Sequence, residues 1–180
     1  MAILKVPVAA SDHILGAYGA TVTVVEYGDY QCPYCAAAQL PVKQILVHYG
    51  SSICLAFRHF PLSEVHPMAG MAAETAEFAG GYGRFWEMHD ALYANQARLS
   101  PDLLLTLVGA LELSPEEFQE ALASGLHAPK VQADFLGGVR SGVNGTPTFF
   151  VNGVRHDAGY SFAELASSID GAMLASRARG

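Results

Sequence analysis

Two cysteines three residues apart, Cys32 and Cys35, lie where one kind of segment ends and another begins. Before them, residues 21–27 are mostly β-branched and are flanked by glycines, which predicts a short buried strand. After them, an alanine-rich segment continues to about Tyr49 and stops at a glycine, which predicts a helix. The cysteine pair is therefore expected at the start of a helix that directly follows a buried strand.

A second strand is predicted over residues 53–60. Because a helix separates it from the first strand, the two form a β-α-β unit and are expected to be parallel. Strand character returns only at residues 148–151, where an Asn-Gly turn predicts a hairpin with residues 154–156. A last helix is predicted from Ser161, whose hydroxyl can form a capping box with Glu164, to about residue 176.

Between these parts, residues 62–143 carry repeated helical signals. The expected helices span residues 68–78, 84–97, 102–111, 116–123 and 130–139. Ser100 and Ser114 each precede a proline, as N-cap residues do, and Ser114 also predicts a capping box with Glu117. At 180 residues, the chain is expected to be one domain, with a core of about 18–61 and 144–176 interrupted by a helical insert of about 62–143.

Composition excludes several classes of function. A formal net charge of −7, with scattered basic residues, argues against a nucleic-acid partner. Apolar runs are far shorter than the roughly 20 residues of a membrane-spanning helix, so no membrane association is expected. The first ten residues do not resemble a secretory signal, which predicts a cytoplasmic protein as written, or an extracytoplasmic one if a natural signal peptide has been removed.

The spacing of the cysteine pair suits disulfide chemistry. Side chains three apart on a helix are neighbours, and a small adjustment brings their Cβ atoms to the roughly 3.5–4.5 Å of a disulfide. The free N–H groups of the helix start favour a thiolate at Cys32, and Pro33 stiffens the first turn. We expect Cys32 to be the exposed nucleophile and Cys35 to be the resolving thiol.

Glu26 is a carboxylate within the first predicted strand, six residues before Cys32. A buried carboxylate is costly unless it is paired or functional. Burial would raise its pKa and make it a proton acceptor for Cys35, and the alternative is that it is paired near the strand edge. Cys54, on the second strand, is expected to be a small core residue.

Metal chemistry has less support in the sequence. Zinc usually takes four Cys or His ligands, whereas this chain offers one cysteine pair, the distant Cys54 and seven histidines that form no ligand-like cluster. His59, His66 and His89 are expected to be hydrogen-bonded. No metal or organic cofactor is expected beyond a redox-active Cys32–Cys35 disulfide. Two alternatives stay open: a dithiol that holds Cu(I) or zinc, and a redox sensor or transferase that acts with glutathione.

Three separated segments together resemble the DsbA-like branch of the thioredoxin superfamily, whose thioredoxin-like relatives occur free or appended to transporters. They are residues 24–35, which contain Cys-Pro-Tyr-Cys, residues 57–62 with His66-Pro67, and residues 145–153. Residues 85–90 resemble the helical insert of the same family. The resemblance implies an α/β thioredoxin fold, with a central mixed sheet flanked by helices and an all-helical inserted subdomain, and the activity of a protein thiol:disulfide oxidoreductase.

The resemblance also implies roles for particular residues. Pro147 is expected to be cis and beside the dithiol, and Thr146 to pair with the main chain of an extended substrate, with Pro33 and Tyr34 at the same site. Glu26 matches the buried acid of the family. The implied partners are protein thiols and disulfides, with glutathione or a thioredoxin-type protein as candidate electron donors.

Tyr34 departs from the histidine found in the most oxidising members and gives the Pro-Tyr pair of glutaredoxins. Without a neighbouring imidazolium, the Cys32 thiolate is less stabilised and its disulfide is a weaker oxidant. The sequence therefore leaves the direction of electron flow open between oxidase, reductase and isomerase.

Overall fold

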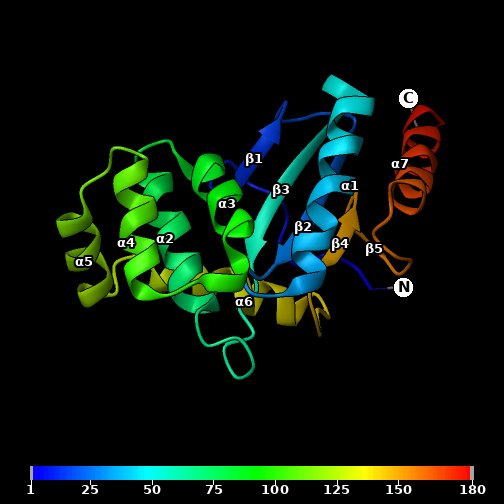
Figure 1. Cartoon of the computed structure of the whole chain (residues 1–180). Helices are drawn as coiled ribbons and strands as arrows, with labels where there is room; N and C mark the ends of the chain where they lie inside the picture. Colours follow the sequence, from blue (N-terminus) through cyan, green and yellow to red (C-terminus); the bar gives the residue numbers. More distant parts are fainter. Residues whose placement is uncertain (1, 179–180) are drawn as a thin grey trace.

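The computed structural model describes residues 2–178, which contain one mixed sheet of five strands (Figure 1). The order across the sheet is β1-β3-β2-β4-β5. The central strands β2 and β3 are parallel, as the β-α-β unit predicts, and the remaining neighbours are antiparallel. The bounds are β1 (His13–Gly16), β2 (Val22–Gly28), β3 (Ile53–His59), β4 (Thr148–Val151) and β5 (Val154–His156).

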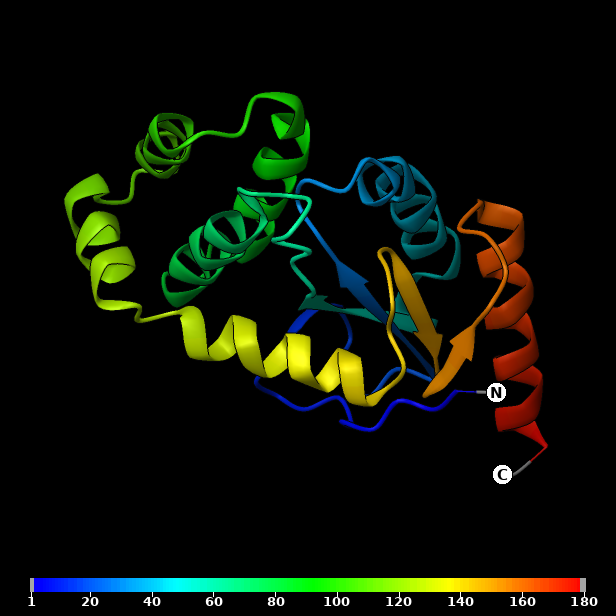
Figure 2. The same cartoon turned by 90° about the horizontal axis from the view of Figure 1, so that it is seen from below.

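Helices cover both faces of the sheet. In Figures 1 and 2, α1 and α7 lie on one face, α6 lies across the other, and α2 to α5 form a group at one end. None of the helices within residues 2–178 is both long and apolar enough to cross a membrane. The bounds are α1 (Pro33–Tyr49), α2 (Ala69–Gly81), α3 (Phe85–Ala94), α4 (Pro101–Ala110), α5 (Pro115–Ser124), α6 (Ala128–Arg140) and α7 (Phe162–Arg177).

The two-residue period of β2 decides which side chains lie beneath α1. Val22 and Val24 pack into the cluster formed with α1 and α7, whereas Val25 and Tyr27 pack into the cluster on the opposite face. Glu26 follows Val24 by two residues, so it points to the α1 face. The strand register thus directs a carboxylate toward the helix that carries the two cysteines.

The helical insert shares its apolar core with the sheet. Tyr30, which follows β2, and Phe57 of β3 belong to the same buried cluster as side chains from α2, α3, α4 and α5. On the other face, Phe135 of α6 stacks on Phe60 with 4.5 Å between the ring centroids. These contacts fix the insert against the end of the sheet from which the dithiol turn emerges.

Helix caps agree with the sequence with one exception. The hydroxyls of Ser100 and Ser114 accept the predicted backbone N–H bonds, and Ser161 forms a complete capping box with Glu164. The capping box predicted at Ser114 is only half formed. The carboxylate of Glu117 accepts instead from the Tyr82 hydroxyl at 2.6 Å, because α5 packs beside the end of α2.

β1 was not predicted from the sequence, since a four-residue strand carries too little alternation to be recognised. The segment before it is fastened by Arg58 of β3, whose buried guanidinium pairs with Asp12 through Nε–Oδ1 and Nη2–Oδ2 distances of 2.8 Å each. Arg58 also donates to the carbonyl oxygens of Val6 and Pro7 and to the hydroxyl of Tyr27. One buried arginine therefore holds the first strand and the preceding segment against the sheet.

We expect Asp12→Asn to lower the free energy of unfolding by about 3 kcal/mol, because it leaves a buried guanidinium without its counter-charge. Burial raises the pKa of Asp12, but the hydrogen bonds from Arg58 and from the Ala9 N–H, together with nearby positive charge, outweigh burial and the net pKa is lowered. The stabilisation is therefore fully present above the pKa that Asp12 has in the unfolded chain. It is lost as the pH falls through the pKa that Asp12 has in the folded protein, and there the wild type and Asp12→Asn should have similar free energies of unfolding.

Urea unfolding between pH 3 and pH 7 measures this difference. Asp157→Asn is the matched control, since Asp157 pairs with Arg155 at the surface, and it should change stability by less than about 0.5 kcal/mol. Equal effects of the two substitutions would contradict the role given to Asp12.

Candidate active site

The two cysteines lie at the start of α1, as predicted. Cys32 is the N-cap residue with extended backbone angles, φ −72° and ψ 118°, and Pro33 begins the helix. The N–H of Cys35 donates to the carbonyl oxygen of Cys32 at 3.1 Å. Both are free thiols in this structure, as is Cys54 in the core.

The expectation that Cys32 is exposed is wrong for this form of the protein. Cys32 is only 4% exposed, and Cys35 is fully buried. The loop at Thr146 covers the nucleophile: Cys32 Sγ donates to the Thr146 carbonyl oxygen at 3.2 Å. The peptide bond between Thr146 and Pro147 is cis. Pro33 and Tyr34 lie at the exposed rim, and 114 residues separate the two sides of the site.

The two thiols have opposite pKa shifts. The hydrogen bond with the Cys35 thiol lowers the pKa of Cys32, and backbone N–H groups of Cys35 and Tyr34 add to this against the effect of burial, giving about 5. Burial raises the pKa of Cys35 well above its usual range, helped by its hydrogen bond to Cys32 and by nearby negative charge. Near neutral pH, Cys32 is therefore a thiolate while Cys35 keeps its proton.

Glu26 is fully buried, and burial raises its pKa to about 8. Neither carboxyl oxygen has a hydrogen-bond partner within the described residues. The charge of Glu26 is among the causes, after burial and the Cys32 bond, that raise the pKa of Cys35, so the two groups interact electrostatically. The burial and the raised pKa predicted for Glu26 are confirmed, and its proton-transfer role stays a prediction.

The turn before Cys32 is held by a carboxylate that the sequence analysis did not single out. Asp29 is buried, and its Oδ1 accepts the N–H of Gln31 at 2.7 Å. Its Oδ2 accepts the N–H of Leu62 and contacts His66 Nδ1, both at 2.8 Å. An Asp whose side chain accepts the N–H two residues later is a turn signal that can be recognised in a sequence. The contacts of Asp29 with the loop after β3 could not be predicted, because that loop is distant in the chain.

A glutamine of the insert completes this support. Gln96, in the connection between α3 and α4, donates through Nε2 to the carbonyl oxygens of Tyr30 and Cys32 at 2.9 Å each. No sequence signal marks Gln96, because its partners lie 66 and 64 residues away. The insert thus fixes the backbone of the turn that presents the nucleophile.

His89 of α3 lies in a buried polar row beside this turn. Its Nδ1 contacts the Tyr30 hydroxyl and its Nε2 contacts Gln39 Oε1, both at 3.1 Å. Burial lowers the pKa of His89 to about 3, so the ring is neutral. The prediction that His89 is hydrogen-bonded is confirmed.

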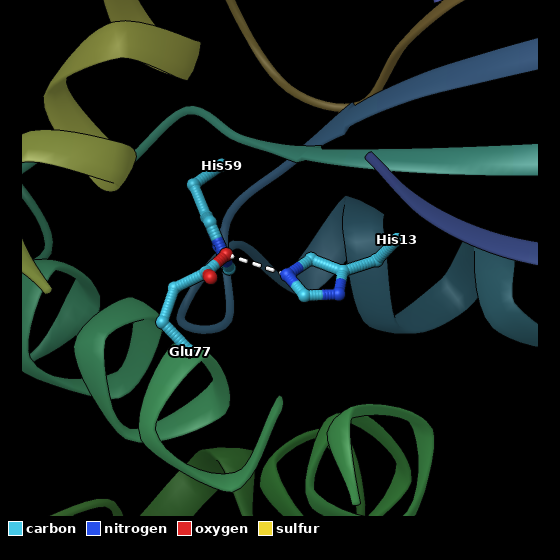
Figure 3. Close-up of side chains that lie close together, drawn as sticks. All are labelled: His13, His59 and Glu77. Carbon is cyan, nitrogen blue, oxygen red and sulfur yellow. Dashed lines mark hydrogen bonds and ion pairs between the residues drawn. The ribbon is translucent and has the colours of Figure 1, made fainter. Parts of the chain in front are cut away.

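The prediction that the histidines form no ligand-like cluster is wrong. Figure 3 shows His13 and His59 converging on Glu77, with Nε2–Oε1 distances of 2.8 Å and 2.7 Å. The sequence conceals this cluster because its members come from β1, β3 and α2.

Comparison with known proteins agrees with this geometry. A family model described as Thioredoxin matches residues 9–171. The chain is 45% identical over 177 residues to a protein of Salinispora arenicola named Na⁺/H⁺ antiporter NhaA 1, an alignment that covers 98% of this chain and 27% of that protein. The chain thus spans about a quarter of the length of this curated relative.

Solved structures share the fold over nearly the whole chain. BdbD from Bacillus subtilis superposes with a TM-score of 0.85 at 23% identity, covering 96% of this chain and 98% of that one. The α-DsbA1 protein of Wolbachia pipientis gives a TM-score of 0.83 at 19% identity, covering 98% and 97%. The predicted thioredoxin fold is confirmed, and the resemblance to DsbA-like proteins is confirmed at the level of the fold.

Alkylation of Cys32 by iodoacetamide should follow a pH titration with a midpoint near 5, because only the thiolate reacts. Cys35→Ala should raise that midpoint, since it removes the largest cause of the lowered pKa. Peptide mass spectrometry after short exposures at each pH measures both values. Cys54 should stay unmodified as an internal control, and a wild-type midpoint near the ordinary value of about 8.5 would contradict the assignment.

Proposed function

This chain belongs to the thioredoxin family, and from that premise we propose that it is a thiol:disulfide oxidoreductase acting on protein substrates. The opposite pKa shifts of the two thiols carry the proposal: Cys32 is lowered to about 5, and Cys35 is raised. Such a pair contains one ready nucleophile and one protonated thiol held in reserve. This is the arrangement that a two-step exchange requires.

The first step is attack by the Cys32 thiolate on one sulfur of a substrate disulfide. A mixed disulfide between Cys32 and the substrate forms, and the other substrate sulfur leaves as a thiolate. Cys35 then loses its proton and attacks Cys32 Sγ, which forms the Cys32–Cys35 disulfide and releases the second substrate thiolate. Two electrons pass from the protein to the substrate, and the reverse sequence oxidises a substrate dithiol.

Glu26 is proposed to accept the proton of Cys35. It lies on the α1 face of β2, interacts electrostatically with Cys35 and has no hydrogen-bond partner among residues 2–178 that would compete for its oxygens. A pKa of about 8 leaves a fraction of Glu26 ionised near neutral pH, and an ionised carboxylate is needed to take the proton.

The loop at Thr146 is proposed to bind the substrate main chain. Its carbonyl oxygen now accepts from the Cys32 thiol. When Cys32 ionises, the sulfur has no proton to donate, so the same carbonyl becomes free to accept an N–H from an extended peptide. Pro147 would lie beside that peptide, with Pro33 and Tyr34 at the exposed rim. Binding through main-chain groups would accept many substrate sequences.

We propose thiol exchange rather than ion transport as the activity of this chain. The relative named as an antiporter is matched over only 27% of its length, and that alignment covers 98% of this chain, which contains the dithiol. The dithiol therefore offers the chemistry that this chain itself can perform.

We expect Cys32→Ser to abolish reduction of a protein disulfide such as that of insulin, because no nucleophile remains. Cys35→Ser should instead accumulate a mixed disulfide at Cys32, since the resolving thiol is missing. Turbidity assays and non-reducing gels with mass analysis distinguish the two variants. Cys54→Ser, at a core position, should keep wild-type exchange, and full activity of either active-site variant would refute the assigned roles.

Glu26→Gln should slow resolution of the mixed disulfide by at least about tenfold, because the amide cannot accept the proton. In the wild type, the resolution rate should rise as the pH passes through about 8, and the variant should lack this rise. Stopped-flow release of a fluorescent substrate thiol measures both. Glu74→Gln is the matched control, since burial also raises the pKa of Glu74 but its position is on α2. Identical pH profiles for Glu26→Gln and the wild type would rule out this role.

A further inference from the structure

Three side chains from separate elements converge on one point outside the dithiol motif (Figure 3). His13 lies on β1, His59 ends β3 and Glu77 lies on α2. The Nε2 atoms of both histidines contact the same oxygen of Glu77, Oε1, at 2.8 Å and 2.7 Å. The three ligand atoms all lie within 4.8 Å of one another.

Strand register explains why the two histidines meet. His13 pairs with Phe57 in the antiparallel β1/β3 ladder. His59 follows Phe57 by two residues, so it is the diagonal neighbour of His13 on the same face of the sheet. Long side chains at diagonal positions reach each other, and α2 adds Glu77 above them.

The orientation of His13 is fixed by its surroundings. The ring of Phe85 stacks on it with 3.5 Å between centroids and 5° between planes. Gly80 of α2 allows the close approach, since a Cβ at that position would lie 3.0 Å from His13 Cε1. The imidazole is therefore held in place by apolar contacts, which leaves Nε2 pointing at Glu77.

The carboxylate of Glu77 is buried without a lysine or arginine partner. Among residues 2–178, its ion-pair partners are His13 and His59 alone. His59 and Glu77 are both buried, and Phe57 and Phe85 pack around the two histidines. A buried carboxylate in apolar surroundings is stabilised by a cation. The groups nearest to Glu77 are the imidazoles of His13 and His59, which are themselves able to bind a metal ion.

We propose that His13 Nε2, His59 Nε2 and a carboxylate oxygen of Glu77 bind a divalent transition-metal ion, with Zn²⁺ as the best match. Two imidazoles and one carboxylate are an established ligand set for zinc, which leaves a further position for water. Bond lengths of about 2.0–2.2 Å require the N–O separations to open from the present 2.7–2.8 Å to about 3.3 Å. Small rotations of the Glu77 and His59 side chains would supply that change.

Protons balance when the ion binds. Each histidine that presents Nε2–H to Glu77 must give its Nε2 lone pair to the metal, so its proton moves to Nδ1 or leaves to solvent. His59 Nδ1 has no hydrogen-bond partner within the described residues, so this shift breaks no existing bond of that atom. The His13 side chain is 19% exposed on an edge strand, which gives the ion a route from solvent.

The bound ion would connect the edge strand, a central strand and the helical insert. It would therefore stabilise the folded chain, because the three ligands come together only after folding. The site shares no residue with the proposed thiol chemistry, so the two proposals can be tested independently.

The test is metal binding in a Cys32→Ser/Cys35→Ser background, where the dithiol cannot ligate, without a histidine tag. We expect one equivalent of Zn²⁺ by titration calorimetry, and Co²⁺ should give visible absorption bands of a low-symmetry site. Both Glu77→Gln and His13→Gln should weaken Zn²⁺ binding by at least about tenfold. Zn²⁺ should also raise the melting temperature of the background protein, but not that of these two variants.

His48→Gln is the matched control, because His48 is exposed on α1, and it should leave binding unchanged. His13 is at the sheet edge, so this variant keeps the test decisive if Glu77→Gln fails to fold. Failure of the background protein to bind stoichiometric Zn²⁺, or equal affinity in His13→Gln and His48→Gln, would overturn the site and leave a hydrogen-bonded His-Glu-His cluster.

Discussion

The electrostatic interaction between the two active-site thiols at the start of α1 is the one on which the rest of the site depends. It is the largest cause of the lowered pKa of Cys32, and it adds to burial in raising the pKa of Cys35, so the pair contains one nucleophile and one reserve thiol. It exists because Cys32 is the N-cap and Cys35 lies one turn later. The strand β2, which precedes the turn, holds this pair in place. The loop at Thr146 covers it.

The helical insert supports this turn as well as enlarging the core. Gln96 binds two carbonyl oxygens of the turn, and Asp29 joins the turn to the loop that leads into the insert. Tyr30 and Phe57 pack among the helices of the insert. The nucleophile is therefore positioned by residues of the insert as well as by the turn that follows β2.

Four buried carboxyl groups show how environment sets the role of a residue type. Asp12 has an arginine, Asp29 has backbone N–H groups and a histidine, and Glu77 has two histidines. Glu26 has no such partner within the described chain, and burial raises its pKa. The carboxylates that have such partners join separate segments of the structure, whereas the uncompensated one can exchange a proton near neutral pH.

The sequence by itself determined the parts that depend on local pattern. The β-α-β unit, the hairpin after Pro147, the caps at Ser100 and Ser161 and the cysteine pair at a helix start all follow from neighbouring residues. Glu26 was also found, because a carboxylate inside an apolar strand is a local anomaly. Only the tertiary structure decided the burial of Cys32, the supports from Asp29 and Gln96, the anchor at Arg58 and the cluster at Glu77. Each of these joins residues that are distant in the chain, and such contacts arise from packing and strand register, which leave no periodic signal in the sequence.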